Sequence, residues 1–393
     1  MAVWPLSAPP RPSPTRCSIG LSKALATVLP PCSLTCPKAW KTLPARLYPN
    51  CRRAACSAPN TKAKRCATIL ACRARTTASS PDAVSRFVII GAGAIGSFLS
   101  TRLHDAGHEV LLIARGARLE ALRNMGVLLS EGGAERQVRV PVSAACDPAT
   151  PPDHAILATK TFQIESALAL LEPLRGSRFT LLTVQNGVEA PGIAQAALPR
   201  AVVLGARMHG FFELEDGIVR HTGVPATLLA GPVADHATDP AAGQASANLA
   251  GDLIAAGVPT TLTGDMRPAL WDKFLMAATI GAVAPAFGLK VGQVLSHPQA
   301  SALLREAMAE VERIATALGI ELPPDCIDEK LDFIGRFPPD VTSSLQRNLE
   351  AGRPSEFVHL SGAIPRFARQ ADLPCPATDE ILARLRARGL QPD

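Results

Sequence analysis

The first 81 residues contain no aspartate and no glutamate, although they hold 13 of the 40 lysines and arginines. Asp82 is the first acidic residue, so residues 82–393 carry the other 27 basic residues against all 34 acidic ones, a formal net charge of −7. The overall charge of +6 therefore belongs to the N-terminal segment. It gives no argument that the rest of the chain binds nucleic acid.

This acid-free segment also lacks a sustained helix or strand pattern, and it is rich in Ala, Ser, Thr, Pro, Arg and Cys. Such N-termini are typical of organelle transit peptides. We expect residues 1–83 to be a transit peptide or disordered leader, cleaved between Ser57 and Val84. Its length and proline content favour a plastid (chloroplast) over a mitochondrion. A disordered basic tail and a mispredicted start codon are the alternatives.

Cysteine is scarce after the leader, where only Cys146, Cys326 and Cys375 of the ten cysteines lie. They are far apart and form no C-x-x-C pair, so the sequence predicts no metal site and no disulfide framework. A reducing compartment fits this usage.

A long apolar run is also missing. The longest uncharged, mainly apolar stretch is 274–289, shorter than the roughly 20 residues that a membrane span needs. It contains Gly281, Pro285 and Gly288. We interpret it as a buried helix of a soluble protein and expect no membrane partner.

The sequence does contain a glycine-rich turn. Residues 86–96 read RFVIIGAGAIG, in which an apolar run stops at Gly91 and a G-x-G-x-x-G pattern follows. The first glycine permits a tight turn, the second lets backbone approach a pyrophosphate, and the third lets helix pack on strand. The next residues predict a helix and a second strand, and the helix N-terminus offers free N–H groups to phosphates. The expected cofactor-binding residues here are Gly91, Gly93, Ala94, Ile95 and Gly96.

The second strand ends in an arginine. A site that prefers NAD usually has Asp or Glu there to hold the ribose 2′-hydroxyl, but no acid lies between Val110 and Arg118, and Arg115 occupies the strand end. A guanidinium suits a 2′-phosphate by its charge and its planar fork of donors. We therefore predict NADPH as cofactor, bound by Arg115, with Arg118 as a second candidate. A solvated surface arginine is the alternative.

Strand and helix patterns alternate between Val84 and Gly264. The strands are short apolar runs with both faces buried, as a parallel sheet requires. We predict an α/β fold with a Rossmann-type doubly wound sheet domain over 84–264. The expected strands are 87–90, 110–114, 138–142, 154–158, 180–184 and 202–205, the expected helices are 96–106, 164–171 and 188–198, and 218–221 and 226–230 are expected to form an antiparallel pair around a Gly-Val-Pro turn.

Strand signals vanish from Asp265 onward. We predict an all-α C-terminal substrate and catalytic domain over 265–393. The expected helices are 266–287, with a proline break near its end, then 301–318, 325–335, 342–350, 357–371 and 378–388.

Lys273 lies in ALWDKFLMAATIG, inside an otherwise apolar predicted helix. An ammonium against an apolar wall is costly unless it meets a partner or a substrate anion; a lysine that snorkels to the surface is the alternative. Ala277 and Gly281 follow on the same helix face. We expect them to leave an open slot beside the ammonium.

Polar side chains follow two expected strands of the sheet. Lys160 comes after 154–158 and Asn186 after 180–184. In open α/β sheets, ligands bind beyond the carboxyl ends of the strands, so both are candidates to contact the nicotinamide end of the cofactor or the substrate. Loop capping is the alternative for each.

Ser344 and Glu356 are 12 residues apart in TSSLQRNLEAGRPSEF. A helix, a turn and a second helix start can bring them together. On the sequence pattern alone, an N-cap role for Ser355 with Glu356 as a first-turn acid is the better interpretation.

Together these segments resemble the ketopantoate reductase (2-dehydropantoate 2-reductase) family over residues 86–388. The stretches that carry the resemblance are VIIGAGAIGSFL, GHEVLLIAR, LATKTFQ, TVQNGVE, LWDKF and TSSLQRNLEAGRPSEF. The resemblance implies NADPH-dependent reduction of ketopantoate to pantoate in pantothenate and coenzyme A biosynthesis. The implied partner is a small-molecule 2-keto acid, and the oligomeric state, a homodimer included, stays open.

The resemblance also implies residue roles. Lys273 is the expected general acid, while Lys160 and Asn186 line the junction of cofactor and substrate. Ser344 is expected to hold the substrate carboxylate. Glu356 is expected to hold and orient the substrate hydroxyl and to offset the charge of Lys273.

One departure concerns the substrate pocket. The family carries asparagines at the positions of Ala277 and Gly281, and a further asparagine is common where Val291 stands. Without these amides we expect a less polar, roomier pocket, which keeps open a related NADPH-dependent reductase of another, bulkier 2-keto acid. A non-catalytic NADPH-binding regulator is a further hypothesis, and Lys273 argues against it because a sensor needs no proton donor there.

Overall fold

The computed structural model describes residues 84–233 and 240–390, which belong to one compact unit. The expected leader over 1–83 and its cleavage site lie outside these residues.

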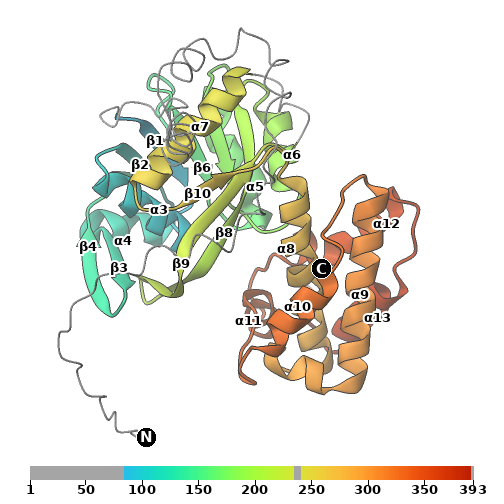
Figure 1. Cartoon of the computed structure of the whole chain (residues 1–393). Coiled ribbons are helices and arrows are strands. Elements are labelled where there is room, and N and C mark those ends of the chain that lie inside the picture. Colours follow the sequence, from blue (N-terminus) through green and yellow to red (C-terminus); the bar gives the residue numbers. More distant parts are fainter. Residues whose placement is uncertain (1–83, 234–239, 391–393) are drawn as a thin grey trace, which may run out of the picture. The chain divides into compact units, whose positions relative to one another are not determined.

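The first half is built on a ten-stranded, mostly parallel sheet with the order β4-β3-β9-β8-β7-β6-β1-β2-β5, and β10 pairs with β9 (Figure 1). At its centre, β1 (Arg86–Ile90) pairs in parallel with β6 (His154–Leu157), and β6 pairs with β7 (Thr180–Thr183). The remaining strands are β2 (Glu109–Ile113), β3 (Val127–Glu131), β4 (Ala134–Val138), β5 (Val142–Ser143), β8 (Val202–Glu215), β9 (Ile218–Gly231) and β10 (Thr260–Leu262).

Helices cover both faces of this sheet, because its central strands are apolar on both sides. Phe87 and Ile89 of β1 pack into a core with α3 (Ala94–Asp105), α4 (Gly116–Met125) and α7 (Pro240–Ala255). Val88 and Ile90 point the other way and pack with α5 (Ile164–Leu171) and α6 (Ala190–Ala197). The predicted doubly wound Rossmann-type sheet is therefore confirmed.

The far edge of the sheet differs from the prediction. We expected a short strand at 202–205 and two strands with a turn between them at 218–230, but β8 and β9 form one long antiparallel hairpin of 14 residues a side. A bulge between His209 and Phe211 interrupts the apolar alternation of β8, and Gly223 lies within β9 at positive φ. These irregularities hid the continuous strands from a period-two pattern.

The strand expected at 138–142 is also wrong. Val138 ends β4, which forms a hairpin with β3, and Val142 begins β5 at the opposite edge of the sheet. Neither β3 nor α4 was expected from the sequence, since only Leu119 and Leu122 of α4 are buried. The segment expected to be one strand, 138–142, therefore contains the end of one edge strand and the beginning of the other.

The second half contains only helices in its described part. They pack around a core centred on α8 and α9. Its helices are α8 (Arg267–Phe287), α9 (Pro298–Ala317), α10 (Cys326–Gly335), α11 (Ser344–Glu350), α12 (Ile364–Gln370) and α13 (Pro376–Ala387).

Two of the helix predictions need correction. Pro285 lies inside α8, which continues to Phe287 and ends at Gly288 in the left-handed conformation. The helix expected at 357–371 begins as two 3-10 turns, 357–359 and 361–363, because Leu360 departs from helical geometry, and only 364–370 is α-helical. Glu356 is the N-cap residue of the first of these two 3-10 turns.

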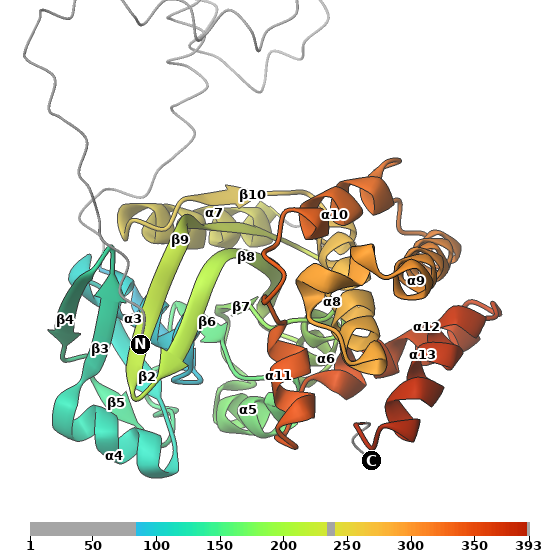
Figure 2. The same cartoon turned by 90° about the horizontal axis from the view of Figure 1, so that it is seen from below.

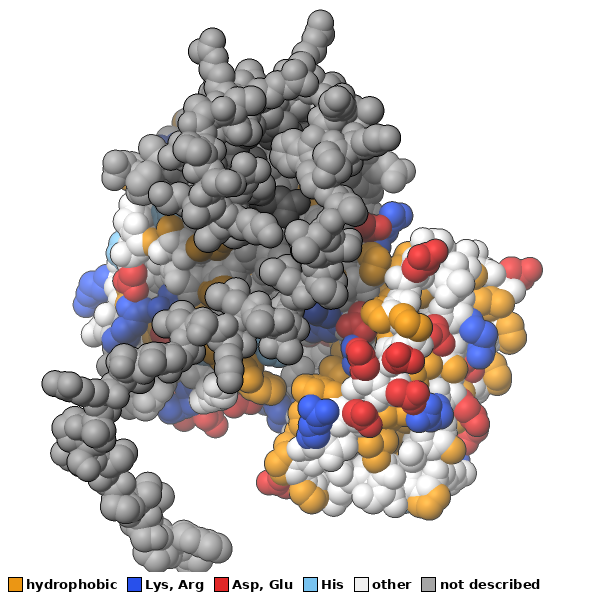
Figure 3. All heavy atoms as spheres, viewed as in Figure 1, with side chains coloured by type: hydrophobic (Ala, Val, Ile, Leu, Met, Phe, Trp, Pro, Cys, Tyr) orange, Lys and Arg blue, Asp and Glu red, His pale blue; other side chains and the backbone are white. Residues whose placement is uncertain are grey.

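Helix α8 is long and apolar enough to cross a membrane by length and composition, but 72% of its most apolar window is buried inside the protein. That burial is the behaviour of a core helix. Figure 2 shows α8 surrounded by the other helices of this half. On the face of the helical half that Figure 3 shows, several acidic side chains lie close together, with basic and apolar side chains around them.

Candidate active site

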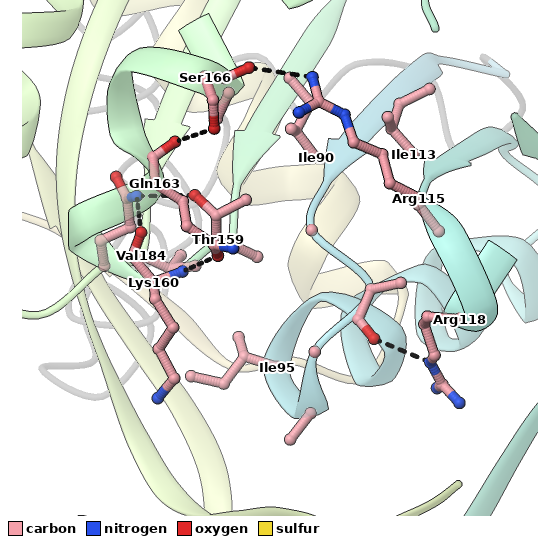
Figure 4. Close-up of a pocket in the computed structure, with 18 of the residues that line it drawn as sticks. Ile90, Ile95, Ile113, Arg115, Arg118, Thr159, Lys160, Gln163, Ser166 and Val184 are labelled. Carbon is pink, nitrogen blue, oxygen red and sulfur yellow. Dashed lines mark hydrogen bonds between the residues drawn. The ribbon is translucent and has the colours of Figure 1, made fainter. Parts of the chain in front are cut away.

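A groove of about 410 Å³ lies beyond the carboxyl ends of β1, β2, β6 and β7. Figure 4 shows Arg115 and Arg118 on one side of it and Thr159, Lys160 and Gln163 on the other. It is the place where open α/β sheets bind their ligands. Of the residues predicted from the sequence, Gly91, Gly93, Ala94, Ile95, Arg115, Lys160, Asn186 and Glu356 line it.

The glycine turn fits a dinucleotide pyrophosphate. Gly91 has φ +109, and a Cβ there would lie 2.7 Å from the backbone nitrogen of Thr159. A Cβ on Gly96 would lie 2.0 Å from the carbonyl oxygen of Gly91, so helix α3 can start this close only with glycine at this position. Gly93 is the N-cap of α3 and no side chain caps it. The first N–H groups of the helix therefore remain free to bind an anion.

Two arginines follow β2 and differ in their bonding: Arg115 is the N-cap of α4, and Arg118 lies in its first turn. Arg115 is exposed and donates one hydrogen bond, from Nη2 to the carbonyl oxygen of Ser166 at 3.2 Å. Arg118 donates to the carbonyl oxygens of Ala92 and Gly217 and to the hydroxyl of Ser97. Its contacts tie the glycine turn to the β8–β9 hairpin, so Arg115 keeps more of its donors for a ligand.

Glu356 joins the two halves of the protein at one end of the groove. Its side chain is buried, and Oε1 accepts a hydrogen bond from the Thr161 backbone N–H at 3.2 Å. The Thr161 hydroxyl lies 2.9 Å from the same oxygen and 2.9 Å from the Asn186 carbonyl oxygen. Oε2 accepts from Asn186 Nδ2 at 3.0 Å and lies 3.7 Å from Lys160 Nζ. The strand-end residues and Glu356 are thus brought together.

These contacts keep Glu356 ionised. Burial alone would raise the pKa of this carboxyl, but the charge of Lys160 and the hydrogen bonds from Asn186 and Thr161 outweigh it and lower the pKa below its usual value. The sequence pattern favoured Ser355 as the N-cap and Glu356 as a first-turn acid, and this is wrong. Glu356 itself is the N-cap of the turn 357–359, and its side chain reaches across to Asn186 at the sheet.

Lys273 lies on α8 and makes no hydrogen bond or ion pair with any residue that the structure describes. Desolvation lowers the pKa of its ammonium, the nearby charge of Arg207 lowers it further, and the charge of Glu356 raises it in part. The lysine is therefore an unpaired proton donor within electrostatic range of Glu356.

Neighbouring charges hold the helix of Lys273 in place. Asp272 accepts a hydrogen bond from Arg207 Nη1 of β8 at 3.0 Å, and Lys330 Nζ of α10 lies 2.6 Å from its other oxygen. The carboxylate of Asp272 thereby links β8, α8 and α10. Arg207 lies within β8, two residues beyond the end of the shorter strand expected at 202–205.

Two expectations about the substrate pocket meet a different packing. Ser344 is exposed as the first residue of α11 and does not line the groove, while its neighbour Ser343 caps that helix. The open slot expected at Gly281 is absent, because a Cβ there would lie 2.9 Å from a methyl carbon of Leu345. Val291 is buried and Ala277 stays partly exposed. The way α11 packs on α8 determines both the exposure of Ser344 and the filling of the slot at Gly281 by Leu345.

Sequence reasoning missed several residues of the site. Thr161 directly follows Lys160, and its place just beyond a strand end was a usable signal. Arg207, Glu189 and Arg366 have partners 65 to 177 residues away, which no local pattern reveals.

The comparisons with known proteins decide the family. The family model "Ketopantoate reductase PanE/ApbA" matches residues 87–235, and the model of its C-terminal part matches 265–389. The chain belongs to the ketopantoate reductase family. As a member, it is an oxidoreductase with a site for a nicotinamide dinucleotide.

The chain matches nearly the full length of its curated relatives in the ketopantoate reductase family. The 2-dehydropantoate 2-reductase of Mycobacterium tuberculosis (strain CDC 1551 / Oshkosh) is 30% identical over 76% of this chain and 96% of that protein. The one from Mesorhizobium japonicum is 28% identical over 77% of this chain and 97% of that protein.

Solved structures agree with this assignment. The PanE/ApbA family ketopantoate reductase from Ralstonia eutropha JMP134 has a TM-score of 0.67 and 31% identity, covering 77% of this chain and 97% of that one. D-mandelate dehydrogenase in complex with NADH and anilino(oxo)acetate has a TM-score of 0.68 at 21% identity, covering 78% of this chain and all of that one, and shares the fold.

The charges around Lys273 predict opposite pH shifts in two variants. A general acid must be protonated, so activity falls as pH rises through its pKa. Glu356→Gln removes the charge that raises the pKa of Lys273 and should move the alkaline limb of kcat/KM to lower pH. Arg207→Met removes a charge that lowers it and should move the limb to higher pH. Shifts of equal sign in the two pH profiles would contradict this arrangement.

Proposed function

We propose that this protein reduces 2-dehydropantoate (ketopantoate) to pantoate with NADPH. The single observation that carries the proposal is the groove that fits a dinucleotide, at whose end the buried Glu356 is held by Thr161 and Asn186. Lys273 of α8 does not line this groove, but the charge of Glu356 acts on its ammonium. Family membership supports the substrate, since relatives at 28–30% identity are named 2-dehydropantoate 2-reductase.

The chain's own residues suit NADPH. The glycine turn and the free N-terminus of α3 would hold the pyrophosphate, and Arg115, with no acid beside it at the end of β2, would bind the 2′-phosphate. Lys160 and Asn186 line the other end of the groove, where they would contact the nicotinamide half. When bound, the cofactor supplies a hydride to the ketone carbon of the substrate.

Lys273 would complete the reduction. Negative charge grows on the ketone oxygen as its carbon is reduced, and an ammonium can hydrogen-bond that oxygen and give it a proton. Desolvation and Arg207 lower the pKa of Lys273, which makes it a stronger acid than a solvated lysine. Glu356 would keep the ammonium protonated at the working pH and orient the substrate hydroxyl.

A second candidate substrate is a 2-keto acid more apolar than ketopantoate; the filled slot at Gly281 gives no support for a bulkier one. Leu345 packs on Gly281, Val291 is buried, and Ala277 borders the same face of α8, so the family's amides are replaced by apolar groups. These contacts favour an apolar substituent on the keto acid where ketopantoate has its hydroxymethyl group.

Turnover tests the function directly. The purified protein without residues 1–83 should oxidise NADPH in the presence of ketopantoate, followed by absorbance. Lys273→Met should lower kcat by about 10²–10⁴-fold, the usual contribution of general acid catalysis. Lys290→Met, an exposed lysine beyond the end of α8, is the matched control and should keep full activity.

The substrate panel separates the alternatives. Activity with another branched or aromatic 2-keto acid, but none with ketopantoate, would favour the second substrate. NADPH binding without reduction of any keto acid would favour a regulator and refute the proposed chemistry.

Arg115→Ala tests the nucleotide preference. We expect NADPH binding to weaken by about tenfold or more, because a charged hydrogen bond is worth ~1.5–3 kcal/mol, while NADH binding changes little. Quenching or enhancement of nicotinamide fluorescence measures both dissociation constants. Arg123→Ala, an exposed arginine on the same helix α4, is the control. Equal losses for both nucleotides would argue against a 2′-phosphate contact.

We also propose that residues 1–83 direct the protein to a plastid. The support is the acid-free, Arg-, Ser- and Pro-containing composition of this segment. A fluorescent protein fused after residue 83 should accumulate in plastids. Accumulation in mitochondria would correct the compartment, and a diffuse cytosolic signal would contradict the targeting role.

A further inference from the structure

A second polar junction lies next to the Glu356 contacts. Glu189 is the N-cap residue of α6, three residues after Asn186, and its side chain makes no hydrogen bond to that helix. Its carboxylate accepts two hydrogen bonds from Arg366 of α12, Nη1 to Oε1 at 2.7 Å and Nη2 to Oε2 at 3.0 Å, and lies 3.2 Å from His359 Nδ1. We call Glu189, His359 and Arg366 the Glu189 clamp.

The Glu189 clamp connects the same two segments as Glu356 does. The segment from Asn186 to Glu189 lies in the loop between β7 and α6, and the segment from Glu356 to His359 is the 3-10 turn after α11 with its N-cap. Between them, Gly187 has φ +85, and a Cβ there would lie 3.1 Å from the carbonyl oxygen of His359. The two segments are therefore paired at both ends and in close contact in the middle.

The clamp is built to remain charged. Burial alone would raise the pKa of Glu189, but the hydrogen bonds from His359 and Arg366 and their charges lower it to about 2. Its contact with Glu189 raises the pKa of Arg366. A bidentate pair of this kind fixes distance and angle as well as charge. Both of its partners come from the helical half of the chain, so the pair fixes the loop after β7 against that half.

We propose that the Glu189 clamp positions Glu356 and Asn186 for the reaction, so that Glu189, His359 and Arg366 are positioning residues of the active site. The inference rests on the proposed function, because it concerns the orientation of substrate at the same site. Without the clamp, the turn that carries Glu356 would lose its charged link to the loop after β7 and would keep the Glu356 side chain contacts, the contact at Gly187 and the apolar packing of Val188.

A displaced Glu356 has a specific electrostatic consequence. The charges that act on Lys273 are Glu356 and Arg207; Arg207 is paired with Asp272, which also contacts Lys330, and Lys160 shares Glu356. If Glu356 moves away, Lys273 keeps the unfavourable desolvation and the charge of Arg207 but loses its favourable partner. Its proton is then lost at a lower pH.

The test is the steady-state kinetics of Arg366→Ala across pH, with the 2-keto acid that the wild-type protein reduces. We expect KM for the keto acid to rise about tenfold, because a displacement of Glu356 by about 1 Å is enough to cause a loss of this size. The alkaline limb of kcat/KM should move to lower pH, in the same direction as for Glu356→Gln. Arg366→Lys, which keeps the charge without the bidentate geometry, should give an intermediate KM.

Two further variants make the result specific. Arg369→Ala removes an exposed arginine from the same helix α12 and should match the wild-type protein. The double variant Arg366→Ala/Glu356→Gln should show no larger pH shift than Glu356→Gln alone, because both changes act through one carboxylate.

A merely structural role gives a different pattern. Partial unfolding reduces the amount of active protein and thus kcat, but leaves KM and the alkaline limb unchanged. That pattern in Arg366→Ala, or a pH shift in the double variant equal to the sum of the single shifts, would overturn the inference. Failure of the proposed function is seen separately, as the absence of turnover in the wild-type protein.

Discussion

The Glu356 carboxylate accepts hydrogen bonds from Thr161 and Asn186, which follow two adjacent parallel strands, although Glu356 itself comes from the helical half of the chain. This one buried charge joins the ends of the sheet to the second half at the mouth of the cofactor groove. Burying a carboxylate is costly unless donors compensate it. The position of Glu356 therefore depends on those strand ends, and the charge experienced by Lys273 depends on Glu356.

The balance of charge follows from this arrangement. Lys160 and Arg207 add positive charge near Glu356 and Lys273, and Asp272 is already shared between Arg207 and Lys330. An anionic keto acid would enter a site with surplus positive charge, where its carboxylate is favoured and the growing alkoxide is stabilised. The contact of Leu345 with Gly281 is apolar and adds no charge near Glu356 or Lys273.

The sequence predicts the parts of this site that local physics determines. The glycine turn and strands β1, β6 and β7 were recognisable because they are short, apolar on both faces and followed by polar residues, which placed Lys160 and Asn186 correctly beside the groove. The β8–β9 hairpin was not recognisable, because a bulge and internal glycines break its alternation. The exposure of Ser344, the filling of the slot at Gly281 and the pairing of Glu189 with Arg366 all depend on how helices and loops pack across the chain, and no spacing in the sequence encodes that register.

The most direct measurement is the titration of Lys273 by NMR of its labelled side chain, in the wild-type protein and in Glu356→Gln. We predict a pKa below the ordinary lysine value in the wild-type protein, because desolvation and the charge of Arg207 both lower it, and a still lower pKa in Glu356→Gln. An ordinary lysine pKa that is the same in both proteins would contradict the electrostatic coupling on which the mechanism rests.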